Sequence, residues 1–458
     1  MKIKNILASA VAAALLGSGT TSCDYLDIMP PEKAGINNTM DNYNQALGYL
    51  YIGYRGITNA FANDWRQGFN TTAGQPLPGL TLGDLQTTTD EWIMDDVQYN
   101  QGPLIRTLYT NSLSSSNNFN VYKCYSINLA NVFLFLEKLD ELGVPSGVVP
   151  EETAVEWRAE GKFLIAYFHY CLLRRYGPIA LVDKRMGMDA SISSFPGRMH
   201  YDYCVDWICK KLDEAAEDLP ATRVASETGR ATSTICKALK ARILLYAASP
   251  LFNGSFPYPD WTNKVETPGY GTELISKTYD RQKWVRAKEA SEEALNIAIN
   301  QAGRELYYGN EGNETDQMMK ATYVPVDGAD DNFKRAVLRM RNVMCAKEPD
   351  GNHEYIWSLI HNCGSDYNQR MVRNPIPKTS AAPNGYAAAY STMGATLATV
   401  ERFLTKDGYQ PKNDPNFPSE DQWYKSAGYA DDNSDASNPA LRSHIINLCK
   451  HREPRFYA

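Results

Sequence analysis

Apolar residues recur at alternating spacings of three and four along six stretches of the chain, and this is the pattern of one buried face of an α-helix. The first stretch follows Thr39, a candidate N-cap, and runs from Met40 to Ile57. The others run from Tyr122 to Leu139, Trp157 to Tyr176, Cys204 to Leu219, Ile235 to Ala247 and Trp284 to Ala298. The Trp157–Tyr176 stretch is apolar on nearly every side, so we expect it at the centre of the protein.

Turn and cap residues mark the ends of several of these stretches. Pro220 follows the fourth, Ser249-Pro250 follows the fifth, and Asp280 is a candidate N-cap for the sixth. The helices fall into sequential pairs, and small residues on facing stripes would let them approach closely: Ala238, Ala241, Ala287, Ala290 and Ala294. The pattern predicts a mostly α fold, a tetratricopeptide-like scaffold of helical pairs without a strict repeat period.

Two long irregular regions interrupt the helices. Residues 62–117 and 302–395 are rich in Gly, Asn and Pro, and loops of this length in a compact body are usually functional or disordered. Trp65, Trp92, Tyr99 and Tyr109 argue against plain disorder in the first region. We therefore predict one domain over residues 23–458, with a helical scaffold at 37–61 and 118–300 and ligand loops at 62–117 and 302–395.

The N-terminus has the pattern of an export signal. Lys2 and Lys4 precede an apolar core from Ile6 to Leu16, which is too short to span a bilayer permanently. Small residues lead up to Cys23, so we predict a lipoprotein signal peptide at 1–22 and acylation of Cys23. The lipobox is imperfect, because Thr20 stands where Leu is usual, and an ordinary secreted protein is the alternative.

The net charge and the cysteine content further restrict the class of protein and its possible partners. The net charge is −7, and loss of the leader with Lys2 and Lys4 makes it −9, so an acidic body of this kind is a poor partner for nucleic acid. Four of the nine cysteines fall within apolar helical patterns and are expected to be buried thiols: Cys171, Cys204, Cys209 and Cys236. Cys345 and Cys363 are the best candidates for a disulfide bridge.

Four ordered segments resemble the landmarks of one known family, the SusD/RagB lipoproteins of Bacteroidetes. Its mature N-terminus is similar to Cys23-Asp24-Tyr25-Leu26-Asp27 with Pro30-Pro31. Its hallmark helix resembles Trp157 to Phe168, continuing through Arg174-Arg175-Tyr176-Gly177-Pro178 to Leu181. A second hallmark resembles Lys237 to Arg242 followed by Leu245 to Gly254, and a later landmark resembles Phe403 with Lys406-Asp407-Gly408.

The resemblance implies a surface-exposed, lipid-anchored protein of the outer membrane. It implies loops that bind oligosaccharides and a SusC-type TonB-dependent transporter as partner, for which the protein acts as a lid. Family members continue well beyond a motif like the one from His451 to Tyr457, whereas this chain stops at Ala458. We therefore expect part of the family fold to lie outside this sequence.

A site for neutral glycans needs aromatic platforms for the CH-rich sugar faces and polar side chains for the hydroxyl edges. The two loop regions supply both kinds of residue: Trp65, Asp84, Asp90, Trp92, Tyr99, Tyr367, Arg370, Tyr386 and Tyr390. By resemblance to the family, we expect both regions to face one site. The alternative is that these rings anchor their loops to the helical body.

The other tryptophans have a different expected role. Trp157, Trp207 and Trp284 lie on helical patterns, and Trp357 lies in a strand-like run from Tyr355 to Ile360, so all four are expected in the core. Trp261, within Phe256-Pro257-Tyr258-Pro259-Asp260-Trp261, is expected to anchor its loop by packing rather than to contact a ligand.

Enzyme and metal signatures are weak. The sequence has no His-Glu-x-x-His, Walker-type or Gly-x-Ser-x-Gly motif, so no catalytic residue is assigned and we expect a binding protein rather than an enzyme. The run Asp431 to Asp435 begins like a calcium loop but has Ala436 where an EF-hand needs Gly, which leaves no cofactor expected and only a looser Ca²⁺ site open. The alternative functions are a helical scaffold for the transporter, a component of peptide uptake, and a helical glycosidase.

Overall fold

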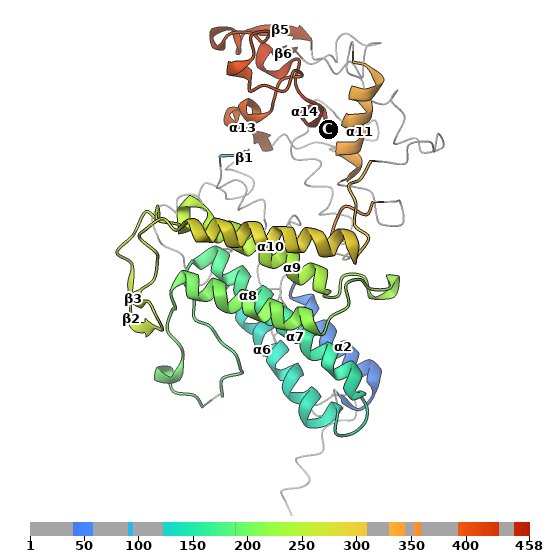
Figure 1. Ribbon diagram of the computed structural model, residues 1–458, viewed down its shortest axis with the longest axis vertical. Helices are drawn as coiled ribbons and strands as arrows, with labels where there is room; N and C mark the ends of the chain where they lie inside the picture. The colour runs from blue at the N-terminus through green and yellow to red at the C-terminus, as the bar shows by residue number, and fades with distance from the viewer. Residues whose placement is uncertain are drawn as a thin grey trace, which may run out of the picture.

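Six helices form the main body of the protein. The computed structural model describes residues 40–57, 90–94, 122–187, 189–308, 329–343, 352–358, 393–429 and 444–458. The helices of the main body are α2 (Tyr43–Arg55), α6 (Tyr122–Lys138), α7 (Glu151–Tyr176), α8 (Tyr201–Glu217), α9 (Ser233–Ala248) and α10 (Arg281–Asn300). Consecutive helices from α6 to α10 pack against one another, and α2 packs against both α6 and α7; we call these six helices the helical layer (Figure 1). The mostly α, tetratricopeptide-like scaffold predicted from the periodicity is confirmed.

All six predicted helices are present, and the differences lie at their ends. The first begins at Tyr43, and its N-cap is Asn42, whose side chain accepts a hydrogen bond from the Gln45 backbone N at 3.0 Å. Thr39, the predicted cap, lies outside the described residues. The α7 helix begins six residues before the apolar pattern, at Glu151, directly after Pro150. Asp280 caps α10 as predicted, because its side chain accepts from the Gln282 backbone N at 2.8 Å.

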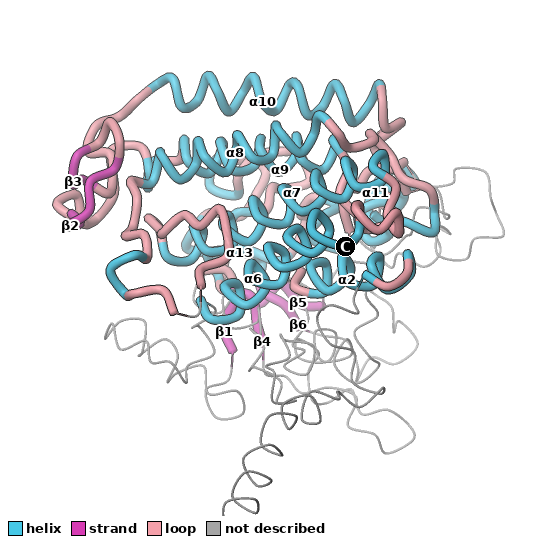
Figure 2. Tube along the Cα trace, turned by 90° about the horizontal axis from the view of Figure 1, so that it is seen from below, coloured by secondary structure: helices cyan, strands magenta, loops and turns pink. Residues whose placement is uncertain are grey.

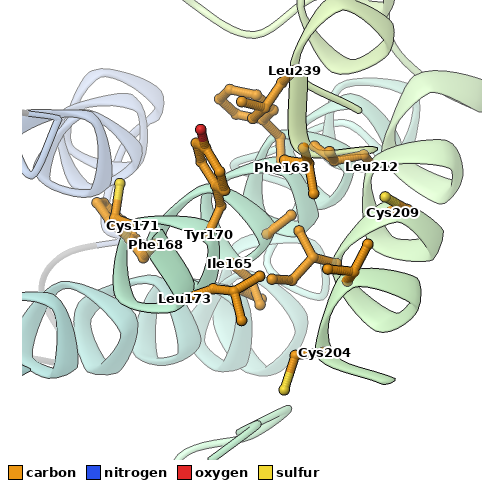
Figure 3. Close-up of a cluster of buried hydrophobic side chains, with 14 of the residues drawn as sticks. Phe163, Ile165, Phe168, Tyr170, Cys171, Leu173, Cys204, Cys209, Leu212 and Leu239 are labelled. Atoms are coloured by element: carbon orange, nitrogen blue, oxygen red, sulfur yellow. The ribbon is translucent and has the colours of Figure 1, made fainter. Parts of the chain in front are cut away.

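The α7 helix is the centre of the core, as its apolar character predicts. Phe163, Phe168 and Leu173 are fully or almost fully buried between α6 on one side and α8 and α9 on the other (Figure 3). Gly161 brings α6 and α7 close together, since a Cβ at this position would lie 2.7 Å from the Leu136 side chain. The end of α6 continues as a π-helical turn over Leu139–Gly143 before the chain turns into α7.

A buried histidine ties α7 to the chain that follows it. His169 is fully buried, and its Nδ1 lies 2.8 Å from the Ile165 carbonyl oxygen. Its Nε2 accepts a hydrogen bond from the Val182 backbone N at 3.1 Å, so the neutral ring carries its proton on Nδ1. Burial lowers the pKa of His169 to about 4.

The α10 helix closes one edge of the layer (Figure 2). Its buried residues are all alanines, Ala287, Ala290, Ala294 and Ala298, as expected for close approach to α9. Lys237 on α9 bridges Asp213 of α8 and Glu293 of α10 with both N–O distances at 2.8 Å. Beyond one end of α10 lies the antiparallel hairpin of β2 (Thr262–Thr267) and β3 (Gly271–Glu273).

Free thiols lie inside the helical layer. Cys171, Cys204, Cys209 and Cys236 are buried and unpaired, as predicted, and burial raises the pKa of the last three to about 12. The predicted Cys345–Cys363 bridge lies outside the described residues.

A smaller lobe lies beyond α10 in Figure 1. It contains α11 (Asp331–Val343), α13 (Leu397–Arg402), α14 (Pro454–Tyr457), β4 (Met393–Ala395), and the antiparallel pair β5 (Ser426–Tyr429) and β6 (His444–Ile446). Arg452 is completely buried there and donates to the carbonyl oxygens of Val400, Phe403, Leu404 and Leu448. One guanidinium therefore satisfies four carbonyl groups and joins the end of the chain to α13 and its neighbours. None of the helices described here combines the length and apolar composition needed to cross a membrane.

Candidate functional site

A short antiparallel ladder joins the two predicted ligand-loop regions. Strand β1 (Trp92–Met94) lies in the first region, and β4 lies at the end of the second. The register places Trp92 opposite Ala395 and Met94 opposite Met393. Segments about 300 positions apart in the sequence are therefore hydrogen-bonded to each other, and the chain leaves β1 at the same end of the ladder at which it enters β4.

Helix α13 holds the residues just before β1 through hydrogen bonds to their backbone. The Thr396 backbone N donates to the Glu91 carbonyl oxygen at 3.0 Å, and the Thr396 hydroxyl donates to the Asp90 carbonyl oxygen. The Thr399 hydroxyl lies 3.1 Å from the Glu91 carbonyl oxygen. Thr396 is also the N-cap of α13, because its hydroxyl accepts from the Thr399 backbone N. The start of this helix is therefore built against the Asp90–Glu91 backbone.

An ion pair completes this contact. Arg402, in the last turn of α13, donates from Nη2 to the Asp90 carboxylate. The hydrogen bond from Arg402 lowers the pKa of Asp90, and the same bond raises the pKa of Arg402. Both side chains are about 60% exposed, so water screens their charges and the attraction adds little to stability. The main effect of the pair is to hold the two side chains in one orientation. We call Asp90, Glu91, Thr396, Thr399 and Arg402 the strand clamp.

Several solved structures share this architecture. The structure of BT4246 superposes on 91% of this chain with a TM-score of 0.75 and 39% sequence identity, and its selenomethionine form gives 0.72 and 37%. A SusD-like protein, BF3747 from Bacteroides fragilis NCTC 9343, superposes on 93% of this chain with a TM-score of 0.58. This chain has a SusD-like fold.

The chain spans 64% of the length of BT4246 and 62% of that of BF3747. Its identity to BF3747 is 17%, so that likeness shows the shared fold and carries no information on ligands. Searches against protein-family models and against curated proteins found no match.

The SusD-like fold places two of the nine predicted ligand residues, and it places them together. Asp90 is an exposed side chain of the strand clamp, paired with Arg402, and the backbone of Trp92 forms the first residue of β1. The side chain of Trp92 and the other predicted residues lie outside what the structure describes: Trp65, Asp84, Tyr99, Tyr367, Arg370, Tyr386 and Tyr390. The carboxylate of Asp90 thus has an intramolecular partner that the sequence did not suggest.

The remaining tryptophans divide between core and surface. Trp157 is 1% exposed, as predicted, and Trp207 is partly buried against the core. Trp284 was predicted in the core but is 40% exposed, because it lies at the edge of the alanine face of α10 on the outermost helix of the layer. Trp261 packs against Phe256 with nearly parallel rings 6.1 Å apart, and this confirms its role as a loop anchor.

Trp357 packs at the core as predicted, but the run around it is not a strand. Residues 355–358 have no strand assignment, and the indole donates to the Gly229 carbonyl oxygen at 3.1 Å. Phe163 and Tyr167 contact the Trp357 ring edge to face, so packing rather than sheet pairing satisfies this apolar run.

A buried ionic network that the sequence analysis missed lies behind Trp357. Glu160, on the hallmark helix α7, is completely buried and accepts hydrogen bonds from Arg230 and from the Tyr54 hydroxyl. Arg223 approaches the same carboxylate with its Nη2 3.4 Å from Oε1. The sequence carries no signal that singles out Glu160, because Glu156, Arg158 and Lys162 lie around it in the same helix.

A pocket of about 40 Å³ adjoins this network, and its lining residues are 221–223, 228–230, Thr232, Thr234, Ile235, Arg304 and 355–358. That volume holds a few water molecules but no sugar ring, since ligand pockets are typically about 300 Å³ or more. In the portion of the chain with described coordinates, no three His, Cys, Asp or Glu side chains gather to hold a metal ion. The candidate calcium run Asp431 to Asp435 lies outside it.

Proposed function

We propose that this chain is a cell-surface glycan-binding lipoprotein that captures oligosaccharides and passes them to a SusC-type TonB-dependent transporter of the outer membrane, for which it acts as a lid. In this proposal the protein binds and releases its ligand without chemistry. Affinity is moderate, because very tight capture would stall transfer into the pore.

The observation that carries the proposal is the β1–β4 ladder in a SusD-like fold. The ladder joins the two regions that supply the aromatic and polar residues a glycan needs. Tyr99 follows β1 closely in the sequence, and Tyr386 and Tyr390 precede β4 closely. Because the chain leaves β1 and enters β4 at the same end of the ladder, covalent connection supports one shared site for these rings.

The membrane role rests on the N-terminal pattern. A short apolar leader ending at Cys23 supports acylation, and a soluble helical body on a lipid tether suits a lid that swings over a transporter. One acyl group binds a membrane reversibly, whereas several acyl groups anchor a protein stably. A Cys23 that carries several acyl groups would therefore keep the protein at the surface during repeated capture and release.

The test is native affinity electrophoresis of residues 24–458 in gels that contain soluble starch, xylan, arabinogalactan or mucin glycans. Trp92→Ala removes one predicted platform. Trp284→Ala is the matched control, because Trp284 is an exposed tryptophan on α10, outside the loop regions. Circular dichroism confirms that each variant keeps its helices.

We expect one class of glycan to retard the wild type and the Trp284→Ala variant, and Trp92→Ala to migrate as if no glycan were present. Equal retardation of all three proteins would remove Trp92 from the site. A folded wild type that no glycan retards would contradict the capture role and favour a scaffold or a peptide-uptake component.

A further inference from the structure

The strand clamp gathers contacts from one short helix onto two consecutive residues. Within the described structure, the carbonyl oxygens of Asp90 and Glu91 both accept hydrogen bonds from Thr396 or Thr399, and the Asp90 side chain pairs with Arg402. These partners are more than 300 positions away in the sequence. They lie immediately before β1, so whatever fixes them also fixes the backbone of Trp92.

A ladder of three residue pairs is too short to hold itself in place. Isolated two-stranded pairings are at best marginally stable in water, and β1 has only three residues. A slip of one residue would turn every side chain of the strand to the opposite face. The register of Trp92 against Ala395 therefore depends on contacts outside the ladder, and the strand clamp supplies them.

We propose that Arg402 and Thr399 are positioning residues of the glycan site, which hold the Asp90–Glu91 backbone so that β1 presents Trp92 in one register beside the end of the second loop region. This inference rests on the proposed function and adds to it two residues on a helix that neither loop region contains. Asp90 itself then acts through Arg402 and does not contact the ligand.

Two features separate this role from a purely stabilising one. Asp90 and Arg402 are about 60% exposed and Thr399 is half-buried, so none of them belongs to the core of the helical layer, which their loss leaves intact. The clamp holds a strand of only three residues. Without the clamp, β1 would be paired with β4 in the observed register in a smaller fraction of the molecules. Apparent affinity falls by the same factor as that fraction. Binding and local exchange should therefore change together, while global stability stays constant.

The experiment compares Arg402→Gln and Thr399→Val with the wild type in chain 24–458. Hydrogen exchange measured by mass spectrometry follows the peptides that contain residues 90–94 and 393–396. Titration with whichever of the four glycans retards the wild type gives Kd. Arg286→Gln is the control, because Arg286 forms an ion pair with Asp206 at 2.6 Å, about as exposed as the clamp pair, between α10 and α8 and outside the clamp.

If the clamped fraction drops to about one tenth in Arg402→Gln, we expect about tenfold weaker glycan binding, faster exchange in both peptides and an unchanged melting temperature. Arg402→Lys, which keeps the charge, should recover part of both losses. The control should match the wild type in every measurement.

The outcomes separate the two proposals. A wild type that binds none of the glycans refutes the proposed function and the positioning role with it. A wild type that binds, together with variants that bind equally well despite faster exchange, refutes the positioning role alone. Unchanged exchange in both variants also refutes it, because the clamp would then not hold β1.

Discussion

The clearest quantitative prediction concerns His169 and acid. The ring is fully buried in α7, and both nitrogens are used: Nδ1–H donates to Ile165, and Nε2 accepts from Val182. A proton added to Nε2 would destroy the second hydrogen bond and place a charge in the buried core, where water cannot solvate it. The folded state therefore resists protonation, and the pKa of His169 falls from 6.5 to about 4.

The sign and size of the effect follow from linkage. Between pH 6.5 and 4 the unfolded chain binds a proton at His169 that the folded chain does not, so stability falls as the pH falls through this window. With pKa values of 6.5 unfolded and about 4 folded, the loss attributable to His169 is about 2 kcal/mol at pH 5 and about 3 kcal/mol at pH 4. Above pH 7 both states are neutral and the contribution vanishes.

The assay is urea unfolding of the wild type and His169→Gln at pH 7 and pH 5, followed by circular dichroism. Carboxylates also lose stability on acidification, but they do so in both proteins and cancel in the comparison. We expect the wild type to lose about 2 kcal/mol more than the variant between the two pH values. His451→Gln, at an exposed histidine, should track the wild type. Parallel losses in wild type and His169→Gln would refute the reasoning.

Three further predictions concern the smaller lobe, the buried network and the anchor. Arg452→Met strands several buried carbonyl groups and should cost about 3 kcal/mol in urea unfolding, whereas Arg455→Met, at an exposed arginine, should cost under about 0.5 kcal/mol; equal losses would contradict the packing argument. Glu160→Gln removes the only fully buried one of the three carboxylates that pair with Arg230, the others being Glu156 and Glu227, and should cost about 3 kcal/mol by the same assay; a loss below about 1 kcal/mol would show that the remaining carboxylates or water compensate. Cys23→Ser in the full-length chain should abolish incorporation of labelled palmitate, and retained label would disprove the assigned lipidation site.

The helical layer was predictable because its information is local. Six apolar periodicities in the sequence became six helices, and Asp280 capped α10 as its position suggested. The prediction was wrong for a residue at the edge of a helical face, which had to be assigned either to the core or to the surface. Trp284 follows the helical period, yet it lies at the edge of the alanine face that packs on α9, so the ring stays partly in solvent.

The candidate site was predictable only in outline, because its contacts join distant segments. Strands of three residues carry almost no periodic signal, and β1 pairs with a strand about 300 positions away. A carboxylate near aromatic residues looks the same in sequence whether it binds a sugar or an arginine, and the pairing of Asp90 with Arg402 becomes visible only in the structure. Likewise, Glu160 is one of several charged residues in the first half of α7, and its partners Arg223 and Arg230 come from a loop after the next helix.

The buried thiols set a condition on how the chain must mature. Cys171, Cys204, Cys209 and Cys236 are shielded from oxidants only after α7, α8 and α9 have packed around them. Their raised pKa values keep them as unreactive thiols in the finished protein. In an oxidising compartment an unfolded chain would instead expose them to random cross-linking, which no later packing could undo. In such a compartment the chain must therefore fold before these four thiols are oxidised, and burial protects them once the helices have packed.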